Sequence, residues 1–125
     1  ISLASFEGNH FNTAGRIARE LVERFLSDPI REPVLLNVNV PDIPYDDLGG
    51  AEVTRLGRRH KAEPVVRMRS PRNDTVYWVG AAGAAAEAGP GTDFNATERG
   101  CVSITPLQVD LTHTAQLQAI ANWLR

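Results

Sequence analysis

The sequence lacks most of the features that mark secreted, membrane or nucleic-acid-binding proteins. Its single cysteine, Cys101, cannot form an internal disulfide, which agrees with a reducing compartment. The formal net charge of -2 gives no overall attraction to nucleic acid or to an acidic membrane surface. No apolar run approaches the roughly 20 residues that span a bilayer, and no leader sequence is recognisable. We therefore expect a cytoplasmic protein without a membrane partner.

Length and composition limit the chain to one domain or to part of one. With 125 residues, of which 42% are hydrophobic, it has enough apolar material for a single modest core. Apolar residues recur at helical spacing from about Asn12 to Ser27, with Asn12 as the expected N-cap, and Asp28 and Pro29 end this helix. Residues 34–40 are mostly apolar and predict a strand covered on both faces, which indicates helices packed on a sheet.

A basic arm follows that strand. Seven of the thirteen lysines and arginines lie between Arg55 and Arg72, with Glu63 as the only acid in that interval. Strands are predicted at residues 53–57 and 75–79. Three interpretations are open: a solvated hairpin, a phosphate or nucleic-acid surface, or a contact between copies of the chain. The interval has no aromatic residue, which argues against base stacking and makes nucleic acid the less favoured partner.

The next segment combines a small-residue stretch with a short helix. Residues 81–91 are almost wholly Ala, Gly and Pro and predict a flexible loop. Thr92 or Asp93 can cap a helix that runs to Arg99, and Gly100 can end it in the left-handed conformation. Thr92 and Asp93 are also candidates for a substrate loop, because a helix N-terminus presents free amides and a flexible approach can move over a ligand. Ordinary capping is the alternative.

The last part of the chain predicts a strand and a helix. Residues 102–105 alternate between apolar and hydroxyl side chains, and Pro106 is expected to close this strand. A helix follows within residues 112–125, capped by Thr112 or Thr114. Its apolar face consists of Leu117, Ile120, Ala121 and Leu124.

Few side chains are placed to do chemistry. Glu7 and His10 lie three residues apart, which on a helix would let them share a metal ion, but Gly8 and Asn9 favour a turn. No Ser/His/Asp or Cys/His arrangement follows from the spacing. Cys101 stands beside apolar strand residues and is expected to be buried and inert.

Several segments in a fixed order carry a resemblance to a known family. They are Leu36–Pro41, Thr54–His60, Tyr77–Gly80, Gly91–Phe94 and Gly100–Leu107. Together they resemble the survival protein SurE family of metal-dependent nucleotide phosphatases, and their order and spacing make the resemblance specific. Cys101 departs from the family pattern, in which a tyrosine usually stands at that place.

The resemblance implies an α/β fold, namely the C-terminal part of a three-layer Rossmann-like SurE fold with a protruding β-hairpin arm and a C-terminal helix. It divides the chain into core (1–50 and 92–111), basic hairpin arm (51–80), flexible loop (81–91) and C-terminal helix (112–125). The family's paired-aspartate motif, Asp-Asp-Gly, is absent, because Asp46 and Asp47 are followed by leucine. We therefore expect the C-terminal half of a larger enzyme, with the divalent metal (Mg²⁺, Mn²⁺ or similar) bound by the N-terminal half.

The same resemblance implies an activity and an assembly. The substrates would be nucleoside 5'-monophosphates, with tolerance of 3'-monophosphates and short polyphosphate. The chain would supply scaffold, the substrate loop at Thr92 and Asp93, and the arm, and would be inactive alone. SurE-like proteins form dimers or tetramers by exchanging C-terminal hairpins and helices, so the predicted contact residues with a second copy are Arg55, Arg58, Arg59 and His60. Arg58 and Arg59 would pair with Asp42, Asp46 or Asp47 of the neighbour. The alternative is a non-catalytic interaction or nucleic-acid-binding module acting through the basic arm.

Overall fold

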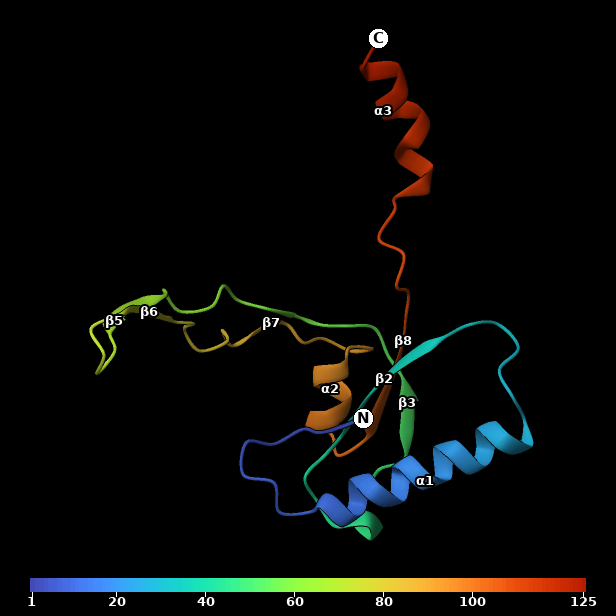
Figure 1. Cartoon of the computed structure of the whole chain (residues 1–125). Coiled ribbons are helices and arrows are strands. Elements are labelled where there is room, and N and C mark those ends of the chain that lie inside the picture. The colour runs from blue at the N-terminus through green and yellow to red at the C-terminus, as the bar shows by residue number, and fades with distance from the viewer.

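In the computed structural model, which describes all residues from 1 to 125, a mixed sheet and two helices form the body, while an arm and a C-terminal helix project from it (Figure 1). The strands are β1 (Ser2–Leu3), β2 (Leu35–Val40), β3 (Ala51–Val53), β4 (Arg58–Arg59), β5 (Val66–Arg69), β6 (Thr75–Trp78), β7 (Ala85–Glu87) and β8 (Val102–Leu107). The helices are α1 (Phe11–Ser27), α2 (Asp93–Glu98) and α3 (Leu117–Trp123), with 3₁₀ turns at Tyr45–Asp47 and Thr114–Gln116. The α/β class predicted from the sequence is confirmed.

The central sheet has the strand order β1-β2-β8-β3. Strand β2 runs parallel to β1 and antiparallel to β8, and β3 runs parallel to β8. The register pairs Val38 with Ile104 and Asn37 with Thr105. Because successive side chains point to opposite faces, this register gives the sheet one apolar face and one polar face.

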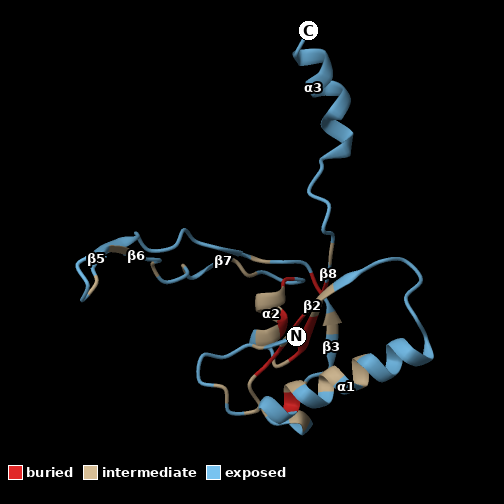
Figure 2. Ribbon diagram, in the orientation of Figure 1, coloured by how far each residue is buried: buried red, intermediate tan, exposed pale blue.

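The apolar face forms the core beneath α1. Val38, Val40 and Val102 are at most 2% exposed and are contacted by Ala14, Ile17 and Leu21 of the helix. Full burial of a valine side chain stabilises a fold by roughly 1.5 kcal/mol or more, so these contacts hold α1 on the sheet. The buried residues gather in and around the central strands, whereas the arm and α3 are almost entirely exposed (Figure 2).

The helix predicted at residues 12–27 is confirmed to within one residue. Its predicted cap was wrong, because the N-cap position belongs to His10, Asn12 lies in the first turn, and no side chain caps the helix. Asp42 instead reaches over from the loop after β2. Its Oδ1 accepts hydrogen bonds from the backbone N–H groups of Asn9, at 3.0 Å, and His10, at 2.7 Å. A distant carboxylate thus fixes the approach to this helix, which no local pattern could show.

Strand β8 runs past the proline that was expected to close it. The strand continues through Pro106 to Leu107. The N–H of Val102 donates to the carbonyl of Gly50, and the carbonyl of Ile104 accepts from the N–H of Thr54, so the backbone groups of the even-numbered residues of β8 point toward the side of β3. Because β3 pairs only with residues 102–104, Pro106 faces an open edge, where its missing N–H breaks no hydrogen bond.

Two short ladders build the arm. β4 pairs with β7 near the body, and β5 pairs with β6 further out (Figure 1). Ala51–Val53, expected at the start of the arm, instead form β3 of the central sheet by pairing with β8. The strand predicted at 53–57 is present only at Val53, because β3 ends there and Arg55 pairs with Thr92 in an isolated bridge. Residues 81–91, expected as a flexible loop, contain β7 and form the returning side of the arm. The arm therefore extends from Arg55 to Gly91. At its base, the backbone N–H of Arg55 donates a hydrogen bond to the carbonyl of Gly91.

The C-terminal helix projects away from the sheet (Figure 1). The helix predicted within 112–125 consists of a 3₁₀ turn followed by α3, and neither Thr112 nor Thr114 caps it with its side chain. Its predicted apolar face is uncovered, with exposed fractions of 59% for Leu117, 52% for Ile120 and 72% for Leu124. No helix of the chain is both long and apolar enough to cross a membrane.

Candidate functional site

A cleft of about 430 Å³ lies over the polar face of the central sheet. Strand β2 forms its floor, the residues after β1 and the helix α2 form its walls, and the base of the arm closes one side. The lining residues are Ala4, Ser5, Phe6, Asn37, Asn39, Arg59, Asp93, Phe94 and Thr97. Because Val38 and α1 occupy the other face of β2, the cleft and the core lie on opposite sides of the same strand.

Thr92 positions the first turn of α2. Its hydroxyl accepts a hydrogen bond from the backbone N–H of Asn95, at 3.2 Å, and donates to the carbonyl of Gly89, at 2.7 Å. The φ angles of Gly91 (+83°) and Gly100 (+76°) put a left-handed residue at each end of the helix. The predicted cap and helix end are thus confirmed. Thr92 is 0% exposed, so it acts here by positioning the helix and not by lining the cleft.

Asp93 lines the cleft and joins α2 to the base of the arm. Its Oδ1 accepts hydrogen bonds from the backbone N–H groups of Gly57, at 2.7 Å, and Phe94, at 2.9 Å. Its own N–H donates to the carbonyl of Arg55 at 3.0 Å. A Cβ atom on residue 57 would overlap the ring of Phe94, so the close approach of this part of the arm to α2 requires glycine at position 57. The carboxylate is therefore a fixed part of the cleft wall.

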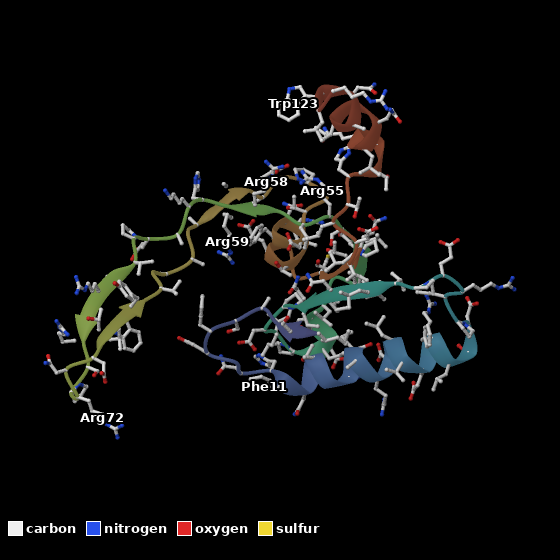
Figure 3. The ribbon with its side chains drawn as sticks, turned by 45° about the horizontal axis from the view of Figure 1, so that its top comes forward. Phe11, Arg55, Arg58, Arg59, Arg72 and Trp123 are labelled. Atoms are coloured by element: carbon white, nitrogen blue, oxygen red, sulfur yellow. The ribbon has the colours of Figure 1, made fainter.

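Arg59 is the cation of the cleft. Its guanidinium carbon lies 4.8 Å from the centroid of the Phe94 ring, within the range of a cation–π interaction. Its Nη1 donates a hydrogen bond to the carbonyl of Gly83 at 3.1 Å. Figure 3 shows Arg59 between the arm and α2. No carboxylate is paired with this guanidinium group, so its charge is available to an anionic ligand.

The other predicted contact residues lie outside the cleft. Arg55 and Arg58 pair with Glu87 at 2.8 and 3.6 Å. All three side chains are substantially exposed, so each pair contributes at most about 1 kcal/mol. Sequence reasoning missed Glu87, because only the β4–β7 pairing brings it opposite Arg58. The side chain of His60 is exposed, and its backbone N–H donates to the opposite side of the arm.

A buried hydroxyl network lies on the polar face of the sheet. Thr54 Oγ1 is 2.8 Å from Ser103 Oγ and 2.7 Å from Thr105 Oγ1, and none of these residues is more than 7% exposed. The sequence predicted the hydroxyl face of β8 but not the participation of Thr54. Asn37 and Asn39 continue the polar face into the cleft, where they are half-buried. Their amides can both donate and accept hydrogen bonds.

The chain offers no good site for a metal ion. No group of three or more His, Cys, Asp and Glu side chains is arranged to bind one. His10 turns toward Asp42, with 3.2 Å between Nδ1 and Oδ1, and not toward Glu7. The hydrogen bond from the N–H of Asn9, with smaller contributions from neighbouring donors, lowers the pKa of Asp42 to about 2. The residues of this chain therefore do not fit the divalent ion that the resemblance implies.

Cys101 is not among the residues that line the cleft. The side chain is buried, as expected from its apolar neighbours. Burial raises the pKa of the thiol, and the nearby Glu52 carboxylate raises the pKa further. Glu52 itself is held 2.6 Å from Arg99, which lowers the pKa of the carboxyl. The thiol is thus protonated at neutral pH and a poor nucleophile.

Comparisons with known proteins agree on one family. The family profile described as "Survival protein SurE" matches residues 1–63. Proteins named "5'-nucleotidase SurE" from Nitrosomonas eutropha and Nitrosomonas europaea are 57% and 59% identical to this chain, covering 99% of it and 50% of their own length. The crystal structure of the SurE protein from Aquifex aeolicus superposes with a TM-score of 0.75 at 33% identity, covering 99% of this chain and 50% of that one. The chain thus spans about half the length of the curated relatives it matches.

Proposed function

This chain belongs to the survival protein SurE family, and on that premise we propose that it is the C-terminal half of a divalent-metal-dependent phosphatase that hydrolyses nucleoside 5'-monophosphates. The name shared by relatives at 57% and 59% identity supports this activity. Nucleoside 3'-monophosphates and short polyphosphate are further substrates under the proposal. The metal ligands belong to the N-terminal half, which completes a three-layer Rossmann-like fold, and the 125 residues alone are inactive.

The cleft is the observation that carries the proposal. A nucleoside monophosphate combines an anionic phosphate, a hydroxylated sugar and an aromatic base. Arg59 supplies a planar cation suited to phosphate oxygens, and the Phe94 ring beside it supplies an aromatic face. Asn37 and Asn39 add amides that can bond to sugar or base. Asp93 fixes α2 and the base of the arm around this space.

The test is phosphate release by the full-length protein from nucleoside 5'-monophosphates with Mg²⁺ or Mn²⁺ added. Loss of a hydrogen bond to a charged group costs about 1.5–3 kcal/mol, so we expect Arg59→Ala to raise KM roughly 10-fold or more. Arg31→Ala removes an equally charged, exposed arginine far from the cleft and should leave KM unchanged. If the KM of Arg59→Ala equals that of the wild-type protein, Arg59 does not bind the substrate. No phosphate release by the wild-type protein removes the phosphatase proposal itself.

The arm and α3 serve in this proposal as contacts with a second copy, in a homodimer or homotetramer. The outer hairpin exposes an apolar face that includes Met68 and Trp78, which are 50% and 63% exposed, and α3 exposes its own apolar face. Exposed apolar side chains gathered on projecting elements are typical of interfaces. Arg58 has a weak partner within the chain and is free to bind a neighbour's Asp46 or Asp47, both of which are exposed.

Sedimentation velocity on the full-length protein tests this assembly. Arg58→Glu combined with Trp78→Glu places like charge on the predicted interface and should shift the sedimentation coefficient to a smaller species. Arg19→Glu combined with Phe25→Glu makes the same changes on α1, where both side chains are exposed, and should leave the sedimentation coefficient unchanged. An unchanged coefficient in the arm variant would count against the role of the arm.

A further inference from the structure

The outer hairpin of the arm has two chemically different faces, set by the register of β5 and β6. The antiparallel pairs are Val66 with Trp78, Arg67 with Tyr77, Met68 with Val76, and Arg69 with Thr75. Side chains of directly opposed residues lie on the same face of a two-stranded sheet. One face therefore carries only apolar residues and the other, here called the basic face, carries Arg67, Arg69, Thr75 and Tyr77.

The charges of the basic face are not neutralised within the chain. Arg67 makes no ion pair, and Arg69 donates only to the backbone carbonyl of Asn73, at 2.8 Å. Arg72 projects at the tip of the hairpin (Figure 3). Asp74 is the only acid of the hairpin, and its carboxylate accepts from the hydroxyl of Ser70.

The register also supplies the aromatic group that the basic segment itself lacks. The interval from Arg55 to Arg72 has no aromatic residue, which argues against base stacking when the sequence is read alone. Pairing places Tyr77 directly across from Arg67, with 66% of the tyrosine exposed. A cationic side chain next to an accessible aromatic ring is the combination that single-stranded nucleic acid requires.

We propose that the basic face of the β5–β6 hairpin binds single-stranded nucleic acid, with Tyr77 stacking on a base and Arg67 and Arg69 contacting phosphates. Residues two apart on a strand are separated by roughly 7 Å along it, so the two guanidinium groups can reach successive phosphates. An unpaired strand is the favoured ligand, because the tyrosine needs a base that is not already stacked in a duplex. This surface is separate from the nucleotide cleft and does not depend on the phosphatase proposal.

Fluorescence anisotropy of a short labelled oligothymidylate with the full-length protein, measured over a series of salt concentrations, tests the inference. Two lost phosphate contacts should flatten the slope of log K against log salt by about 1.4, so we expect that change in Arg67→Ala combined with Arg69→Ala. Tyr77→Ala should weaken binding roughly 5-fold or more at an unchanged slope, and Tyr77→Phe should restore binding.

A matched variant separates this site from general charge effects. Arg19→Ala combined with Arg31→Ala removes the same charge from exposed positions outside the arm. It should bind like the wild-type protein. The inference is overturned if the wild-type protein does not bind at low salt or if the Arg19 and Arg31 variant loses as much affinity as the hairpin variant. It is also overturned if inorganic polyphosphate displaces the oligonucleotide while Tyr77→Ala has no effect, since that result indicates a phosphate-chain site.

Discussion

Replacing Thr54 by valine should destabilise the protein through the hydroxyl network on the polar face of the sheet. Valine has nearly the same shape, so Thr54→Val opens no cavity, but it removes the group that Ser103 Oγ and Thr105 Oγ1 both contact, at 2.8 and 2.7 Å. Ser103 is 0% exposed and Thr105 is 3% exposed, so water cannot easily replace the lost partner. A buried polar group left without a partner costs about 1–3 kcal/mol. We expect the free energy of unfolding to fall by roughly 2–6 kcal/mol for the two hydroxyls together.

Urea denaturation of the full-length protein measures this loss. With a typical m-value of about 2 kcal/mol/M, the midpoint should fall by roughly 1–3 M while the slope stays constant. Thr54→Ser keeps the hydroxyl and loses one methyl group, so its cost should be nearer 1 kcal/mol. Thr112→Val makes the same change at an exposed position and should be close to neutral. The reasoning is refuted if Thr54→Val changes stability by less than about 0.5 kcal/mol, or if Thr54→Ser is as damaging as Thr54→Val.

Two further predictions concern carboxylates that accept backbone hydrogen bonds. The hydrogen bond from the N–H of Asn9, with smaller contributions from neighbouring donors, lowers the pKa of Asp42 from 3.8 to about 2. The ionised Asp42 carboxylate therefore stabilises the folded protein at any pH above its pKa in the unfolded chain. This stabilisation is lost as the pH falls from 3.8 toward 2. Stability measured across that range should therefore depend less on pH in Asp42→Asn than in the wild-type protein, and equal slopes would contradict the assignment. Asp93→Ala removes the acceptor for the N–H of Gly57 and should lower turnover by 10-fold or more while stability falls by only about 1–3 kcal/mol. Asp93→Asn, which keeps an acceptor oxygen, should retain the fold, and a loss of activity that merely follows the loss of folded Asp93→Ala protein would exclude a role in the cleft.

The structure changes the interpretation of the basic arm more than that of any other segment. Along the sequence, its lysines and arginines belong to one basic segment in which Glu63 is the only acid. Strand pairing divides them, because Glu87 faces Arg58 in one ladder and Tyr77 faces Arg67 in the next. The environment of Arg59 differs from that of both Arg58 and Arg67, because its guanidinium group lies over the ring of Phe94 in the cleft. These partners come from β6, β7 and α2, which lie too far along the chain for any local pattern to assign.

Local interactions explain which features the sequence could determine. The helix at 12–27 follows from apolar spacing of 3.6 residues, and α2 follows from a Thr92 cap and a Gly100 terminator, all of which act within a few residues. The alternation of residues 102–105 similarly determines that one face of β8 is apolar and the other is hydroxyl-bearing.

Only the tertiary structure decided which of these surfaces meet. The N-terminal approach to α1 depends on Asp42, more than thirty residues away, and the continuation of β8 through Pro106 depends on where β3 stops. The cleft exists because the register of β2 and β8 turns Asn37 and Asn39 away from the core and toward α2. Side-chain periodicity is a property of neighbouring residues, and so it can be identified directly from the sequence. Register and long-range hydrogen bonds depend on the packing of the whole sheet, and they determined the site.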